Sequence, residues 1–85
     1  MHSALMVPQV EAVWFQGNNY RIVPLNPSLN QASRMLDAAI QQGVWMNPDP
    51  NRPEFYDVQL TTGCAYIHVR HRTRNVYVVG YRQLS

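Results

Sequence analysis

The sequence predicts an α+β fold: an antiparallel sheet of about five strands in the order ββαβββ, with one helix packed on one face. Two patterns support this prediction. Segments near both ends of the chain alternate apolar and polar residues, as half-buried strands do, and a segment between them repeats its apolar residues at helical spacing. A chain of 85 residues can bury one modest core, so we expect residues 1–85 to form a single small domain.

The first two expected strands are residues 10–15 and 20–23, which are rich in β-branched and aromatic side chains. Gln-Gly-Asn-Asn stands between them. Because Gly and Asn tolerate the positive φ angles of tight turns, the two strands are predicted to form a hairpin. Pro24 and Pro27 end it, since proline has no N–H to donate to a strand ladder. The sequence leaves open whether this hairpin joins the sheet of the later strands.

A helix is expected over residues 29–42. The Ser28 hydroxyl can accept an N–H of the first turn as the N-cap. Gly43 can adopt the left-handed conformation that ends a helix. The apolar side chains at helical spacing, which should face the core, are Leu29, Ala32, Met35, Leu36, Ala39 and Ile40.

Residues 44–54 are predicted to be a loop. They contain three prolines, and proline together with the restricted residue before it disfavours both a helix and a central strand. Trp45 and Met46 precede these prolines. We expect the two side chains to anchor the loop by closing the open end of the core between the helix and the sheet.

The last third of the chain predicts a meander of three strands, residues 55–60, 64–71 and 76–82. A slip of one residue exchanges the two faces of a strand, so the register is chosen to give one consistent apolar face. This places Leu60 opposite Ala65 and His71 opposite Val76. The expected core face is Tyr56, Val58, Leu60, Ile67, Val69, Val76 and Val78.

The other face of the meander carries polar and aromatic side chains: Asp57, Gln59, Cys64, Tyr66, His68, Arg70, Tyr77, Val79 and Tyr81. Five strands are about 24 Å wide, whereas a helix with its side chains is about 10–12 Å across. One helix therefore covers about half of one face. Several aromatic side chains left to water are typical of an interaction site. Either the sheet curls on itself toward a half-barrel, or another molecule supplies a second layer. We expect a second copy of the chain or another protein to cover this face.

The candidate binding residues are Asp57, Tyr66, His68, Arg70, Arg72, Arg74, Tyr77 and Tyr81. Tyr and Arg are enriched in the contact faces of proteins, which favours self-association or another protein as the partner. Single-stranded nucleic acid is the alternative, because bases stack on aromatic side chains of exposed sheets. Against that alternative, the chain has seven Arg but no Lys, and its net charge is only +2.

A catalytic site would use His68 as a general base oriented by Asp57, which the register places opposite it. Cys64 lies about 13 Å from His68 along an extended strand, too far to be activated by the imidazole. A cross-strand ion pair is the simpler interpretation, so we do not expect an enzyme. His68 and His71 have opposite parity and cannot ligate one metal ion together. No glycine-rich phosphate motif or other cofactor motif is present.

The single cysteine excludes a framework of internal disulfides, which favours a reducing compartment. No apolar run reaches the length of about 18 residues that a membrane span needs, so we expect a cytoplasmic protein that does not bind membranes. Taken together, the sequence predicts a small non-catalytic interaction module without a cofactor or metal. It would work as a homo-oligomer or by binding another protein, with single-stranded nucleic-acid binding as the alternative.

Overall fold

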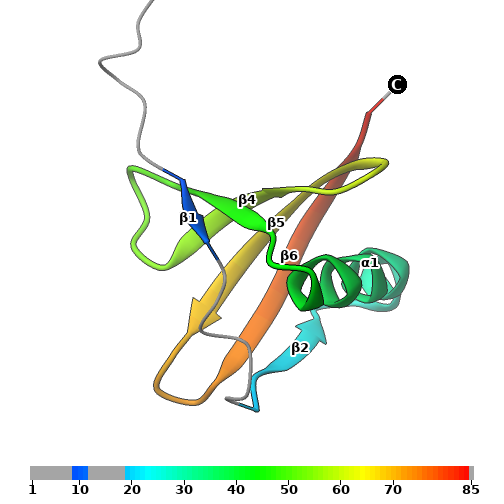
Figure 1. Ribbon diagram of the computed structural model, residues 1–85. Helices are drawn as coiled ribbons and strands as arrows, with labels where there is room; N and C mark the ends of the chain where they lie inside the picture. Colours follow the sequence, from blue (N-terminus) through cyan, green and yellow to red (C-terminus); the bar gives the residue numbers. More distant parts are fainter. Residues whose placement is uncertain (1–8, 12–18, 85) are drawn as a thin grey trace, which may run out of the picture.

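The computed structural model describes residues 9–11 and 19–84. The strands of this part are β1 (Val10–Glu11), β2 (Arg21–Pro24), β3 (Trp45–Pro48), β4 (Phe55–Gln59), β5 (Gly63–Arg70) and β6 (Asn75–Gln83). They form one sheet in the order β1-β3-β4-β5-β6-β2, in which only the β2–β6 pair is parallel. A 3-10 turn, η3 (Pro27–Leu29), leads into the helix α1 (Asn30–Gln41), which packs on one side of the sheet (Figure 1).

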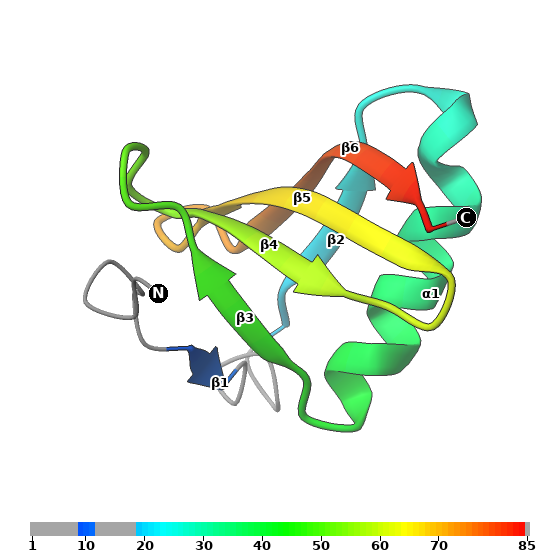
Figure 2. The same cartoon turned by 90° about the horizontal axis from the view of Figure 1, so that it is seen from above.

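This architecture confirms the predicted α+β class and the predicted order of elements, with β3 as an added strand after the helix. Figure 2 shows the sheet from above, with α1 along one side of it and β2 beside β6. No helix in the described residues is long and apolar enough to cross a membrane.

The helical segment begins with the 3-10 turn at Pro27, two residues before the predicted start, whereas α1 itself begins one residue after it, at Asn30. The Asn26 side chain accepts the backbone N–H of Ser28 at 3.0 Å, so Asn26 caps the 3-10 turn, and Ser28 is not the N-cap. The reason is Pro27, whose fixed φ suits the first position of a helical turn and whose missing N–H needs no partner there. Gly43 has a φ of 83°, which confirms the predicted left-handed end.

The core lies between α1 and the face of the sheet that α1 covers. Its buried apolar residues are Leu29, Ala32, Leu36, Ile40, Met46, Val58, Leu60, Ala65, Ile67, Val69, Val76 and Val78. Tyr56 is partly buried against them, so the predicted core face of the meander is confirmed. The helix contributes Ala32, Leu36 and Ile40 at spacings of four residues, as its amphipathic pattern requires.

The described parts of the two strands predicted to form the first hairpin do not pair with each other: β1 pairs with β3 and β2 pairs with β6, at opposite edges of the sheet. Residues 12–15 of the first expected strand and residues 16–18 of the expected turn lie outside the described residues. A strand can pair with a free sheet edge if its apolar side chains then face the core. The edge of β6 meets this condition for β2, because Ile22 lies beside Val76 on the core side.

The prediction that residues 44–54 form only a loop is also wrong, because β3 runs between β1 and β4. β1 pairs only with Trp45 and Met46, so Pro48 lies beyond this pairing, where its missing N–H breaks no bond to β1. Met46 is fully buried, as expected of an anchor, whereas Trp45 is 50% exposed. Met46 and Trp45 are neighbours on a strand and therefore point to opposite faces.

The register of the meander differs from the predicted one by two residues. Phe55 pairs with His68 and Asp57 with Tyr66 because Leu60 and Gly63 close a two-residue turn, shorter than the predicted one. Between β5 and β6 the turn is built on residues 71–74, with Arg74 at a φ of 58°. A shift of two residues preserves the faces of a strand, so the predicted faces survive although the predicted partners do not.

A β-bulge in β6 changes the face of one predicted site residue. Ile67 pairs with Val78 and Tyr66 with Gly80, so Val79 is the extra residue. Beyond the bulge the alternation is reversed. Tyr81 pairs with Ala65 and packs against the core, so its predicted place on the outer face is wrong.

The burial pattern predicts which leucine the fold depends on. Leu36 is fully buried, so Leu36→Ala should lower the free energy of unfolding by about 2–5 kcal/mol. Leu25 is 57% exposed, and Leu25→Ala should change it by less than about 0.5 kcal/mol. Urea denaturation of both variants measures the difference. Equal losses in the two would contradict the described packing.

Candidate functional site

The sheet face opposite α1, here called the outer face, carries a row of side chains across four strands. Phe55 of β4 pairs with His68 of β5, which pairs with Tyr77 of β6, which lies beside Val23 of β2. These four residues, three with rings and one valine at the end, are here called the aromatic row. Each of them is partly exposed, and the buried residues between them along the strands point the other way, toward α1.

Two rings of the row, Phe55 and His68, stack on each other, and the Tyr77 ring is tilted by 36° relative to His68. The Phe55 and His68 ring centres are 4.2 Å apart, with planes 3° from parallel, and the His68 and Tyr77 centres are 6.2 Å apart. The Arg52 guanidinium carbon lies 3.9 Å from the Phe55 centre. Arg52 and His68 therefore both lie in contact with the Phe55 ring.

Tyr66 joins this cluster to the loop between β3 and β4. Its ring lies 5.5 Å from that of Phe55, and its hydroxyl donates a hydrogen bond to Asp49 Oδ2 at 2.5 Å. Asp49 Oδ1 accepts the backbone N–H of Asn51 at 2.9 Å. The bond from Tyr66, followed by that from Asn51, lowers the pKa of the Asp49 carboxyl below its usual 3.8. The same bond raises the pKa of Tyr66, because it requires the protonated phenol.

The structure brings together three of the predicted site residues, Tyr66, His68 and Tyr77, with Arg70 next along β5 on the same face. Asp57 is also on this face but pairs with Tyr66, so the predicted contact between Asp57 and His68 is wrong. The hypothesis of a catalytic pair of His68 and Asp57 was based on that contact, which the structure does not contain.

Two further predicted residues, Arg72 and Arg74, lie in the exposed turn between β5 and β6 rather than on a strand. Within the described ranges, no three His, Cys, Asp or Glu side chains gather in a way that could hold a metal ion.

Three members of the cluster were missed by sequence reasoning: Asp49, Arg52 and Phe55. Phe55 shares strand parity with Asp57, so its place on the outer face could have been read from the sequence. Asp49 and Arg52 could not, because they come from a loop. That loop folds back through the bond from the Asp49 N–H to the Phe55 carbonyl oxygen and the bond from the Phe55 N–H to the Arg52 carbonyl oxygen.

Charged residues on the outer face are unequal in sign. Strand pairing and ring stacking place four arginines there, namely Arg21, Arg52, Arg70 and Arg82, and three acidic residues, Glu11, Asp49 and Asp57. The exposed surface around the aromatic row is therefore net basic.

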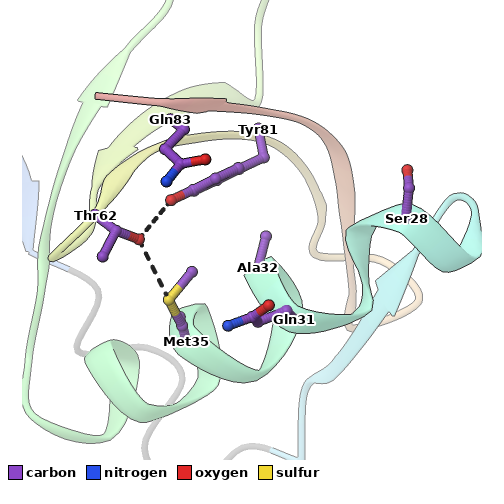
Figure 3. Close-up of a pocket in the computed structure, with 7 residues that line it drawn as sticks. All are labelled: Ser28, Gln31, Ala32, Met35, Thr62, Tyr81 and Gln83. Carbon is purple, nitrogen blue, oxygen red and sulfur yellow. Dashed lines mark hydrogen bonds between the residues drawn. The ribbon is translucent and has the colours of Figure 1, made fainter. Parts of the chain in front are cut away.

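A separate cavity of about 240 Å³ lies on the helix side of the sheet (Figure 3). Thr62 stands at its wall between Tyr81, whose hydroxyl lies 2.6 Å from the threonine oxygen, and the Met35 sulfur at 3.6 Å. Its remaining lining is Ser28, Gln31, Ala32 and Gln83. No ionisable carboxylate or base lines this cavity. The Thr62 and Tyr81 hydroxyl groups bond each other and the Ser28 hydroxyl donates to Asn26, so the outer face is the stronger candidate site.

Comparison with known proteins adds no relative: no family model matches the chain, and no curated protein or solved structure gives a significant match.

The bond between Tyr66 and Asp49 predicts a pH dependence. Because folding lowers the pKa of Asp49, its carboxylate stabilises the fold above pH 3.8, and this contribution is lost as the pH falls through the lower folded-state value. Tyr66→Phe removes the largest cause, so the pKa of Asp49 should rise toward 3.8, as measured by carboxyl NMR. Tyr77→Phe is the matched control and should leave it unchanged, since the Tyr77 hydroxyl bonds Asn75. An unmoved Asp49 in Tyr66→Phe would refute the assignment.

Proposed function

We propose that this protein is a non-catalytic interaction module whose outer face binds another polypeptide. The observation that carries the proposal is the aromatic row with its stacked Arg52, which lies on the face of the sheet away from α1. Contiguous aromatic side chains exposed on a small protein are typical of an interaction site. Tyr and Arg are also the residue types that dominate the binding energy of protein interfaces.

The stacking supports binding because it fixes the side chains in advance. Arg52 is held over Phe55, and Phe55 is held against His68. Tyr66 is fixed at its hydroxyl end by Asp49. Ordering a flexible side chain at an interface costs about 0.5–1.5 kcal/mol, and a cluster already ordered in the free protein avoids most of that cost.

The geometry favours a polypeptide over single-stranded nucleic acid. Bases bind to such sheets by stacking on free ring faces. Here Arg52 and His68 already lie against the Phe55 ring, which leaves less of it open to a base. Asp49 and Asp57 also lie on this face, where they would repel phosphate groups.

Charge favours a partner of different sequence over a second copy. A two-fold dimer through this face would bring two surfaces together that each carry four arginines against three acidic residues. Like charges brought together at an interface oppose binding. The complementary partner is a surface with an apolar centre and carboxylates around it, which can pair with Arg70 and Arg21.

The first test is the mass of the protein in solution, with a monomer as the expected result by light scattering. A dimer that dissociates in Phe55→Ala would show a second copy on this face and would overturn the choice of partner.

The second test selects binders from a displayed library of short random peptides, with the 85-residue chain as the target. Enriched peptides should combine apolar residues with Asp or Glu. Their affinity should fall about tenfold or more in Phe55→Ala, because truncating a central contact costs more than about 1 kcal/mol. Gln41→Ala, an exposed change on α1, is the control and should leave it within about twofold.

Two results would contradict the proposal. Peptides that bind wild type and Phe55→Ala equally would place the binding surface elsewhere. Salt-dependent binding of labelled oligothymidine that is lost in Tyr77→Ala, with no peptide binder found, would favour the nucleic-acid alternative.

A further inference from the structure

The hollow above Gly80 is the feature of the outer face that the aromatic row does not explain. It measures about 360 Å³ and lies between β4, β5 and β6. It is lined by Asp57, Cys64, Tyr66, Gly80, Tyr81 and Arg82. Its volume is at the lower end of the range of about 300–1,000 Å³ that is usual for binding pockets.

Neither the backbone conformation nor steric crowding requires a glycine at position 80. Gly43 needs its φ of 83°, and a Cβ at Gly63 would overlap the Arg82 carbonyl oxygen and the Tyr81 ring. Gly80, by contrast, is outside the left-handed region, and a Cβ built on it meets no atom within 4 Å. Any small side chain would fit there without strain. The absence of a side chain at Gly80 therefore creates open space on the surface and does not relieve a steric clash.

The bulge determines where this space opens. Because Val79 is the extra residue, Gly80 rather than Val79 comes to lie beside Tyr66 on the outer face. The hollow thus adjoins the ring that stacks on Phe55, and it continues the surface of the aromatic cluster. Without the bulge, the alternation of β6 would put Val79 and Tyr81 on this face.

The lining defines the chemistry of the occupant. Its uncharged lining residues are Cys64, Tyr66, Gly80 and Tyr81. Two charged residues also line it, Asp57 and Arg82, and their opposite signs give no preference for a charged group. A neutral apolar side chain, aliphatic or aromatic, meets these conditions.

We propose that this hollow is the pocket that receives an apolar side chain of the bound polypeptide, and that Gly80 determines specificity by keeping it open. The inference rests on the proposed function, because the hollow lies within the surface that is proposed to bind the polypeptide. An anchor seated in a pocket beside a rigid aromatic cluster is the arrangement that concentrates binding energy in protein interfaces.

Cys64 allows a direct test, because it is the only cysteine of the chain and lines the hollow. The full chain is equilibrated with small symmetric disulfides in the presence of a competing thiol. The Cys64 thiolate attacks the S–S bond of the probe, one thiol leaves, and the mixed disulfide at Cys64 is measured by mass spectrometry. The probes are the disulfides of 2-phenylethanethiol and 2-methyl-1-propanethiol as apolar thiols, with those of cysteamine and 2-mercaptoethanesulfonate as charged ones. The apolar thiols should be retained about tenfold more strongly, since the pocket buries their extra carbons.

Gly80→Val fills the hollow and should abolish this preference while leaving capture of the charged thiols unchanged. Gly80→Ala is the smaller change, which should reduce the preference in part and keeps the test valid if the valine variant does not fold. Ala38→Val enlarges an exposed side chain on α1, on the other side of the sheet from the hollow, and should leave capture within about twofold of wild type.

The peptides selected on the outer face complete the test. Gly80→Val should weaken them about tenfold or more. Equal capture of all four thiols, or peptides that bind Gly80→Val as they bind wild type, would overturn the pocket assignment. If those peptides still depend on Phe55, the proposed function stands without the pocket. If no peptide depends on Phe55, both proposals fail.

Discussion

The alternation of side chains along β5 is the constraint on which the rest of the molecule depends. β5 pairs with β4 on one side and β6 on the other, so its pleat sets the faces of the whole meander. Ala65, Ile67 and Val69 point into the core, and Tyr66 and His68 point out. A slip of one residue would put an imidazole and a phenol into the apolar interior, so packing holds the aromatic row in place as firmly as it holds the core.

Periodicity predicted the faces of the elements well and their partners poorly, for a physical reason. Burial repeats every second residue in a strand, so Ile67 and Val76 could be assigned to the core without knowing which residues lie opposite them. Partners depend on turn length, and the two-residue turn closed by Leu60 and Gly63 could not be distinguished from a longer one. The edge positions of β1 and β2 depend on which edges remain free, which no local pattern encodes.

The candidate site was predicted in part for the same reason. Tyr66, His68 and Tyr77 follow from strand parity alone, whereas Tyr81 was misplaced because a bulge reverses parity without a marker in the sequence pattern. Asp49 and Arg52 reach the outer face through loop hydrogen bonds. Their contribution shows why the cluster is more rigid than a strand pattern suggests: side chains of the strands and of a loop hold one another.

The parallel pairing of β2 with β6 has a consequence for the order in which the chain folds. β4, β5 and β6 are joined by short turns, so they can pair through residues that are close in sequence. Ile22 of β2 pairs with Val76 of β6, which is far from it in sequence, so this pairing requires the closure of a long loop. During synthesis, β2 leaves the ribosome long before the edge that receives it exists. The N-terminal part of the sheet therefore spends that interval unpaired, and the Pro24 at the end of β2 limits how well it can pair with a wrong strand meanwhile.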